Sequence, residues 1–487
     1  MSAPLLPYGF ARRAGVLPRE GDDGLIHCLH RPGAGIAALL EMQRLHGARL
    51  RLQSIDEAGF EAAIAADYRD TAGDAVDLSD TDDLAALADS AAAVDDLLDS
   101  RDDSPVIRLI NALLLQAVKD GASDVHVETQ EKRLIVRFRV DGVLKDMIEP
   151  KRALAPLLVS RIKVMARLDI AEKRLPQDGR VTLRVGGHDI DVRVSTIPTQ
   201  HGERVVMRLL DRGSAGLDMA SLGMSERHLE AFRSLIDRPH GMLLVTGPTG
   251  SGKTTTLYTA LAYLNDRKRN IMTVEDPIEY ELAGVAQTQV NSRTGLDFAR
   301  GLRAILRQDP DVIMVGEIRD RETADVAVRS SMTGHFVLST LHTNSAIGAV
   351  TRLIDMGVER YLLAPMVVGL IAQRLVRRLC GQCRWQDRST EAESLLLGRA
   401  IKPGKKIWRA NGCDHCHGEG YRGRIGLYEI VVADDRLRGL VHDGASETAL
   451  TAAAREGGPS LLEDGIAKLR AGLTSIEEVA RVVRDES

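Results

Sequence analysis

One segment constrains the fold more than any other part of the sequence. A mostly apolar stretch from Gly241 to Thr246 leads into the pattern G-x-x-x-x-G-K-T, which spans Gly247 to Thr254, and a helical pattern follows. Glycines let backbone N–H groups turn inward around phosphate oxygens, and a helix N-terminus adds positive potential. The segment therefore predicts a strand, a phosphate-binding loop and a helix within a mostly parallel α/β sheet.

This phosphate loop predicts specific nucleotide contacts. We expect Lys253 to reach the β- and γ-phosphates and the Thr254 hydroxyl to hold Mg²⁺. The residues expected to contact the nucleotide here are Gly247, Pro248, Thr249, Gly250, Ser251, Gly252, Lys253, Thr254 and Thr255. The alternative, a glycine-rich turn without a ligand, does not explain why the strand, the spacing and the Lys-Thr pair occur together. Taken alone, the loop indicates an ATPase or a GTPase.

A second apolar stretch begins at Pro310 and ends in Gly316 and Glu317. Hydrolysis needs an acidic group near the metal ion and the attacking water, so we predict that Glu317 is the general base. The second motif of phosphate-loop enzymes usually ends its strand in Asp. A Gly-Glu ending could combine metal contact and water activation in one residue. A glutamate that only caps the strand is the alternative.

A third acidic run follows the β-branched stretch that starts at Ile271. It contains Glu275, Asp276 and Glu279, and it falls at the edge of a parallel sheet where ligands bind. These carboxylates either position Mg²⁺ through water or are simply solvated at the end of a strand. The sequence leaves both alternatives open.

Two histidines, His335 and His342, lie in the segment from Gly334 to Asn344. They are an odd number of positions apart, so on a regular strand they face opposite ways. His342 comes at the end of the strand, where a group sensing the γ-phosphate would lie, and we assign it to the catalytic set. His335 fits a structural role equally well, and the sequence does not decide its role.

Arginines of the preceding domain are further candidates. Arg193 and Arg208 lie on two expected strands, and Arg180 lies just upstream. Surface arginines are common. Phosphoryl transfer, however, leaves charge on the γ-oxygens that an arginine from another domain can neutralise. We therefore expect Arg193 and Arg208 to contact the nucleotide when the domains close.

Four of the five cysteines form two CxxC pairs, Cys380 with Cys383 and Cys413 with Cys416. Four thiolates predict a closed, structural tetrahedral zinc site. Neither pair follows the strand-to-helix turn of a thioredoxin motif, which disfavours the redox alternative. His415 and His417 are unnecessary as ligands beside a full cysteine set. The long segment between the pairs predicts a protruding hairpin loop, and Cys28 is expected only to pack.

Composition narrows the class of protein. The net charge of -5 and the scarcity of aromatic residues, 3%, argue against nucleic acid as a partner. The chain lacks an apolar run of the roughly 18 residues that span a bilayer, and its start lacks a signal-peptide core. We therefore expect a cytoplasmic protein, and the CxxC pairs fit a reducing compartment.

Changes in the sequence pattern along the 487 residues predict several domains. A small leading domain, with a helix from Ile36, is followed by an Asp-rich linker. A helix starting at Ser104-Pro105 and strands up to about Asp211 then form a mixed α+β domain. Beyond Cys416 the pattern looks largely helical, including Glu447 to Glu456. The expected boundaries are 1–70, 71–104 (the linker), 105–212, 213–379 (the sheet with the phosphate loop), 380–430 (the cysteine module) and 431–487.

Together these motifs resemble the secretion ATPase superfamily that drives type II secretion and type IV pilus assembly. The phosphate loop, the aspartate box Thr273-Val-Glu-Asp-Pro-Ile-Glu-Tyr, the segment 311–320 with Glu317 and the histidine box 334–344 match its motifs. The resemblance implies a RecA-like P-loop ATPase domain preceded by a mixed α+β (PAS-like) domain, with a small zinc module and a small N-terminal domain. Val192-Arg193 and Met207-Arg208 resemble the family's nucleotide-reaching arginines. ATP, Mg²⁺ and Zn²⁺ are the implied cofactors.

Within this superfamily, the four cysteines resemble assembly-type members, and the leading segment Leu6-Pro-Tyr-Gly-Phe-Ala-Arg looks most like the type II secretion E component. That resemblance implies a homohexamer at the inner membrane. Its leading domain would dock on the L component of the secretion platform, and the polytopic F component is a further expected partner. The motor would push pseudopilus subunits and so export folded proteins across the outer membrane. The alternatives are a pilus-assembly ATPase, a DNA translocase and a non-hydrolysing nucleotide sensor or assembly scaffold.

Overall fold

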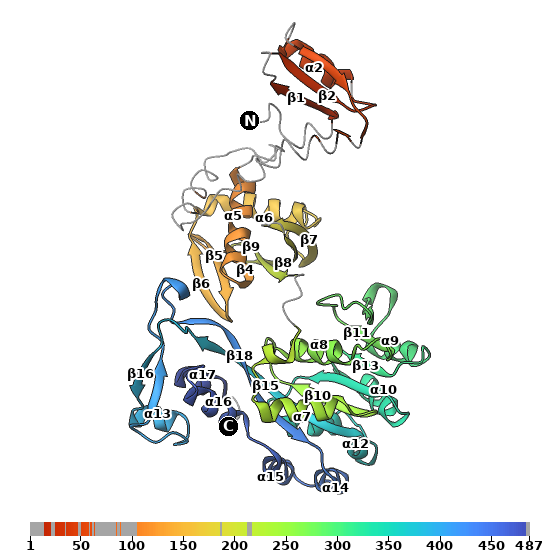
Figure 1. Ribbon diagram of the computed structural model, residues 1–487, viewed down its shortest axis with the longest axis vertical. Helices are drawn as coiled ribbons and strands as arrows, with labels where there is room; N and C mark the ends of the chain where they lie inside the picture. The colour runs from red at the N-terminus through yellow and green to blue at the C-terminus, as the bar shows by residue number, and fades with distance from the viewer. Residues whose placement is uncertain are drawn as a thin grey trace. The chain divides into compact units, whose positions relative to one another are not determined.

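The computed structural model describes residues 14–20, 25–34, 36–46, 50–57, 59–60, 63, 84, 88, 105–185, 188–211 and 217–483. Contacts divide the chain into two compact units, Met1–Leu87 and Ala88–Ser487 (Figure 1). The segment from Leu6 to Arg12, nearly all of the expected linker and the expected helix cap Ser104 lie outside the described residues. The domain boundaries given above stay predictions.

The first unit contains a small three-stranded sheet and a helix. Strand β1 (Val16–Glu20) pairs antiparallel with β2 (Ile26–His30), which pairs parallel with β3 (Leu50–Ser54). Helix α2 (Ile36–His46) connects β2 to β3, and the helix expected from Ile36 is confirmed. Cys28 is fully buried in an apolar cluster and its burial raises the pKa of its thiol, so the expectation that it packs is also confirmed.

The second unit begins with a mixed domain whose six-stranded antiparallel sheet has the order β6-β5-β4-β9-β8-β7. Helix α5 (Pro105–Lys119) buries its apolar face, as its periodicity predicts. The expected turn at Asp141 and Gly142 is confirmed, since both residues have positive φ between two strands. The strands are β4 (Ala122–Thr129), β5 (Leu134–Val140), β6 (Val143–Ile148), β7 (Gln177–Val185), β8 (His188–Thr199) and β9 (Gly202–Asp211), and α6 (Ala155–Met165) was not predicted.

The next domain is a seven-stranded sheet of order β12-β11-β13-β14-β10-β15-β18, parallel except for its last strand. Every residue of β10, β13 and β14 is buried, as expected for strands covered on both faces. The strands are β10 (Gly241–Thr246), β11 (Ile271–Glu275), β12 (Ala286–Gln289), β13 (Val312–Val315), β14 (Phe336–Leu341), β15 (Val367–Leu379) and β18 (Tyr421–Val432).

Helices cover both faces of this sheet. One face packs on α7 (Glu226–Ile236) and α8 (Lys253–Leu264), through residues such as Phe232 and Leu257. The opposite face packs on α9 (Phe298–Ile305), α10 (Arg321–Met332), α11 (Ala346–Asp355) and α12 (Arg360–Met366). The predicted α/β sheet is therefore confirmed.

The region after Cys416 corrects one expectation. It opens with the long strand β18, which pairs antiparallel with β15 from Gly369↔Val432 to Leu379↔Tyr421. The β-branched and aromatic side chains of this segment fit a sheet better than a helix. Only after β18 is the chain helical, in α14 (Asp435–Asp443), α15 (Glu447–Gly457), α16 (Leu461–Arg470) and α17 (Ile476–Val483).

The segment between the two cysteine pairs also differs from expectation. Strands β16 (Trp385–Arg388) and β17 (Lys406–Arg409) form the predicted hairpin, with α13 (Glu391–Leu396) between them. The segment does not protrude freely, because its buried Leu397, Ile401 and Ile407 pack on apolar residues of α16 and α17. Among the described residues, no helix is long and apolar enough to cross a membrane.

Candidate functional site

The phosphate loop lies at the carboxyl end of β10, between its neighbours β14 and β15. Gly247, Gly250 and Gly252 have φ of +148°, +79° and +87°, values that side chains disfavour. Gly252 directly precedes α8, so the loop runs into a helix N-terminus as the motif predicts. This backbone can turn its N–H groups toward an anion.

Lys253 is drawn into the loop. Its side chain is only 7% exposed, and Nζ donates to the carbonyl oxygens of Gly247 at 2.7 Å and Pro248 at 3.1 Å. Burial lowers the pKa of Lys253 to about 8, although the charge of Glu317 opposes this. An incoming phosphate would relieve the cost of burying this ammonium group.

Other polar groups of the loop fit a phosphate and a metal ion. Ser251 Oγ is buried and has no hydrogen-bond partner within the part of the chain that is described. Thr254 and Thr255 are exposed, so their hydroxyl groups are accessible. An orphaned hydroxyl beside a cradle of N–H groups fits an anion with bound Mg²⁺.

The acid and the histidine of the predicted catalytic set meet beside this loop. Glu317 comes just after β13 and His342 just after β14, and these strands are parallel neighbours. His342 Nε2 lies 3.3 Å from Glu317 Oε2. Arg319, for which no role was predicted, binds the other oxygen of Glu317 and lies 3.9 Å from Asp276.

These neighbours set the charge state of Glu317, whose side chain is 15% exposed. Burial raises the pKa of this carboxyl group, but the bond and charge of Arg319, together with His342, outweigh burial and hold the pKa below its ordinary value. Glu317 is therefore an ionised carboxylate at neutral pH. It can accept a proton from water once one of its oxygens is released.

His335 and His342 have different surroundings. His335 precedes β14, and its Nδ1 lies 2.9 Å from the carbonyl oxygen of Ser330 and 3.0 Å from Thr333 Oγ1, at the end of α10. This place favours a structural role for His335. Beside His342, the N–H of Thr343 donates to Thr246 Oγ1 at 3.0 Å and joins the ends of β14 and β10.

Glu275 does not fit either alternative considered for it. It is 3% exposed, and its oxygens accept hydrogen bonds from Thr273 at 2.6 Å, Gln287 at 3.0 Å and the Tyr258 hydroxyl. A carboxylate buried and held by three donors is not simply solvated, and its burial argues against contact with metal-bound water. Asp276 and Glu279 instead face the arginines Arg319 and Arg193.

The two candidate arginines have different partners. Arg193 Nη2 donates to the carbonyl oxygen of Ile278 at 3.1 Å and lies 3.2 Å from Glu279, so it reaches the acidic segment after β11. Burial lowers the pKa of Arg193. Arg208 pairs at 2.9 Å with Asp124 of its own sheet. Arg180, Arg193 and Arg208 form one cross-strand row, but the structure brings only Arg193 to the phosphate-loop domain.

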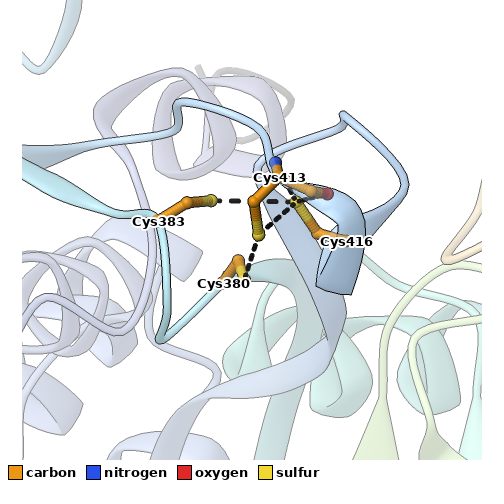
Figure 2. Close-up of side chains that lie close together, drawn as sticks. All are labelled: Cys380, Cys383, Cys413 and Cys416. Atoms are coloured by element: carbon orange, nitrogen blue, oxygen red, sulfur yellow. Dashed lines mark hydrogen bonds between the residues drawn. The ribbon is translucent and has the colours of Figure 1, made fainter.

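The four paired cysteines converge, as Figure 2 shows. Three sulfur–sulfur distances are 3.9 Å for Cys380–Cys413, 3.7 Å for Cys383–Cys416 and 3.8 Å for Cys413–Cys416. A tetrahedral zinc ion with bonds of about 2.3 Å separates its sulfur ligands by about 3.8 Å. The geometry therefore fits zinc.

Backbone donors favour thiolates in this cluster. The N–H groups of Gly420 and Cys413 lie 3.1 and 3.3 Å from the Cys416 sulfur, and that of Gly412 lies 3.3 Å from the Cys383 sulfur. Although burial raises the pKa of Cys416, the N–H groups of Cys413 and Gly420 and the neighbouring thiols outweigh it and lower the pKa to about 7. Burial and the same neighbours raise the pKa of Cys413 to about 11, so a metal ion would have to displace the proton of that thiol. His415 contacts Arg422 and is not part of the cluster.

Comparisons with known proteins agree with these observations. A family model described as "Type II/IV secretion system protein" matches residues 99–481, and a model of a domain of "GSPII protein E" matches residues 5–68. The Type II secretion system protein E of Pseudomonas aeruginosa is 56% identical, covering 99% of this chain and 96% of its own length. The Type II secretion system ATPase E of Vibrio cholerae is 51% identical, covering 99% and 97%.

Solved structures show the same architecture. The pilus retraction motor PilT with bound ADP has a TM-score of 0.53 and 27% identity, and the match covers 77% of this chain and 96% of that one. The ATPase DotB of Legionella pneumophila has a TM-score of 0.58 at 21% identity, over 78% and 95%, a likeness that concerns the fold alone. The phosphate-loop fold, the cysteine cluster and the matches over nearly all of its length agree, and the chain belongs to the type II secretion system protein E family of secretion ATPases.

Proposed function

We propose that this chain hydrolyses ATP at the phosphate loop 247–254 and uses the energy to drive type II secretion. One observation carries the assignment of the site. The loop after β10, Glu317 after β13 and His342 after β14 lie at the carboxyl ends of adjacent parallel strands. This edge is where ligands bind in open α/β sheets. Full-length relatives named for type II secretion support this role over pilus assembly.

Each side chain of the site has a proposed task. The loop N–H groups and Lys253 hold the β- and γ-phosphates, and the Thr254 hydroxyl holds Mg²⁺, which neutralises developing charge. Glu317 orients the attacking water and accepts its proton, while His342 fixes one carboxylate oxygen and senses the γ-phosphate. Arg193 would leave Glu279 for the γ-oxygens when ATP is bound.

The acidic and arginine partners have secondary tasks in this proposal. Asp276 holds Arg319 and would position Mg²⁺ through water, whereas Glu279 holds Arg193 until a nucleotide arrives. Arg208 would have to exchange Asp124 for the nucleotide to act as the resemblance implies. The carboxylate of Glu275 supports β11 through its buried hydrogen bonds.

The other parts of the chain fit a motor of a secretion platform. The match to the domain of GSPII protein E covers the leading residues and supports their docking on the inner-membrane L component, with the F component as a further partner. We propose a cytoplasmic homohexamer held at the inner membrane by these proteins. Zinc on the four cysteines would be structural, because four thiolates leave no open position for catalysis.

The central test is Lys253→Ala in the full-length protein. It should abolish ATP hydrolysis and export of the secreted substrates, while zinc content stays unchanged because the cysteine cluster is remote in sequence and has its own packing. Lys268→Ala is the matched control, since Lys268 is exposed and outside the loop. Hydrolysis and export retained by Lys253→Ala would refute the proposal. Stimulation of hydrolysis by DNA would favour the translocase alternative.

A further inference from the structure

The two glycines that bracket the phosphate loop pack on the same residue of the neighbouring strand. A Cβ atom at Gly247 would lie 2.4 Å from the carbonyl oxygen of Gln373, and one at Gly252 would lie 2.8 Å from the Gln373 side-chain nitrogen. Gln373 belongs to β15, which pairs with β10 up to Thr246↔Ala372. The loop therefore turns directly over Gln373, which forms its floor.

The side chain of Gln373 is fixed from the other side. It is 2% exposed, and its Oε1 accepts a hydrogen bond of 2.7 Å from the Thr256 hydroxyl, which is fully buried. Thr256 lies one turn into α8, where its N–H donates to the carbonyl oxygen of Gly252 at 3.1 Å. A single buried hydrogen bond thus joins the floor of the loop to the helix that the loop begins.

Thr256 and Gln373 are themselves held in a rigid setting. Tyr428 lies opposite Gln373 on β18, and its hydroxyl donates to the carbonyl oxygen of Leu222 at 2.9 Å. Buried, satisfied polar networks of this kind keep one arrangement of the surrounding backbone. The network touches the phosphate loop but not Glu317 or His342.

From this geometry we infer that Gln373 and Thr256 are positioning residues that preorganise the phosphate loop for nucleotide binding. The inference rests on the proposed ATP-binding function of the loop. A preorganised cradle lowers the ordering cost of binding, so loss of the Thr256–Gln373 bond should weaken ATP binding and leave the chemical step almost unchanged. The effect should therefore appear in KM and not in kcat.

The test uses variants of the full chain that change this bond and little else. Thr256→Val removes the hydroxyl group at nearly constant shape, and Gln373→Met removes the amide at similar length. Each should raise KM, and the dissociation constant of a fluorescent ATP analogue, about three- to tenfold, the effect of one buried hydrogen bond. The value of kcat should stay within about twofold. The double variant should be no weaker than the single ones, because both remove the same bond.

Two further variants distinguish positioning from simple loss of packing. Thr256→Ser keeps the hydroxyl and should restore KM to within about twofold of the parent value. Thr259→Val makes the same substitution one turn along α8, where the hydroxyl donates to the carbonyl oxygen of Thr255, and it should leave KM unchanged. Circular dichroism checks that each variant is folded.

The outcomes separate this inference from the proposed function. A parental KM in folded Thr256→Val, or an equal rise in Thr259→Val, would overturn the positioning role. If Lys253→Ala still abolished hydrolysis in that case, the proposed ATPase function would stand without a positioning role for Thr256 and Gln373. Retained hydrolysis in Lys253→Ala would instead remove the basis of both.

Discussion

Replacing Glu317 by glutamine gives a sharp test of the proposed chemistry. The substitution keeps the size of a side chain that is only 15% exposed, and it removes the negative charge that accepts the proton from water. Arg319 loses a charged partner, but Arg319 is 58% exposed, so the loss should change the free energy of unfolding by less than about 1 kcal/mol. Glu317→Gln should therefore fold normally.

The structure sets the expected size of the kinetic effect. A positioned general base accelerates reactions by about 10²- to 10⁴-fold. Arg319 and His342 hold the pKa of Glu317 below its ordinary value, which weakens it as a base and favours the lower part of that range. We expect kcat to fall about 10²- to 10³-fold, equal to about 3–4 kcal/mol of activation free energy. Binding of ATP should persist, since the phosphate loop is unchanged.

The assay compares phosphate release at saturating ATP with binding of a fluorescent ATP analogue, on the same protein preparations. Glu322→Gln is the matched control, because Glu322 lies nearby at the start of α10, is 61% exposed and pairs with the exposed Arg303. Its kcat should equal that of the parent protein. A loss smaller than tenfold in Glu317→Gln, with binding intact, would show that another group activates the water.

Two further predictions concern the zinc cluster and the C-terminal helices. Cys413→Ser should reduce the zinc content, measured by elemental analysis, from about one ion per chain to almost none, and should lower the melting temperature. The control Cys28→Ala should retain the ion. Full zinc content in Cys413→Ser would contradict the proposed zinc site. Glu478 is 3% exposed and bonds Arg377. Burial raises the pKa of Glu478, but its arginine partners outweigh burial and lower the pKa overall. The stabilisation by Glu478 is therefore complete above about pH 4.5 and is lost as the pH falls through the lowered pKa. Glu478→Gln should therefore lower the free energy of unfolding by about 1–3 kcal/mol at pH 7, seen as a lower melting temperature, and by less at acid pH. The control Glu477→Gln changes an exposed residue and should leave the melting temperature unchanged at both pH values. Equal melting temperatures of Glu478→Gln and the parent protein at pH 7 would contradict this role.

Local patterns predicted much of the fold because they carry their own physical constraints. The glycines of the phosphate loop, the apolar run of β10 and the turn at Asp141 each need a particular backbone, and the structure has it. The strand β18 was missed, because its place is set by pairing with β15, a partner distant in the sequence. Helix α6 was missed for the same reason, since the burial of its apolar residues depends on the sheet against which it packs.

The site was predictable where residues follow strands and less so where contacts are tertiary. Glu317 and His342 could be placed together because neighbouring parallel strands end at one edge. The roles of Glu275, held by three donors in a buried place, and of Arg319, bound to Glu317, depend on side chains from separate segments. An acidic run alone does not indicate which carboxylate is buried. The only sequence signal for the role of Arg319 was its position two residues after Glu317.

The pairing of β15 with β18 has a consequence for how the chain folds. The two strands are joined by the whole cysteine segment, so their pairing must close a long loop, and closing such a loop costs chain entropy. Cys380 directly follows β15, and Cys416 precedes β18 by a few residues. A metal ion that binds before the strands pair would hold Cys380 close to Cys416 and so shorten the loop that remains to be closed. Pairing of β15 with β18 could then begin at the strand ends next to the cysteines, Leu379 and Tyr421. Zinc would then lower the entropy cost of folding, and this contribution would not depend on nucleotide binding.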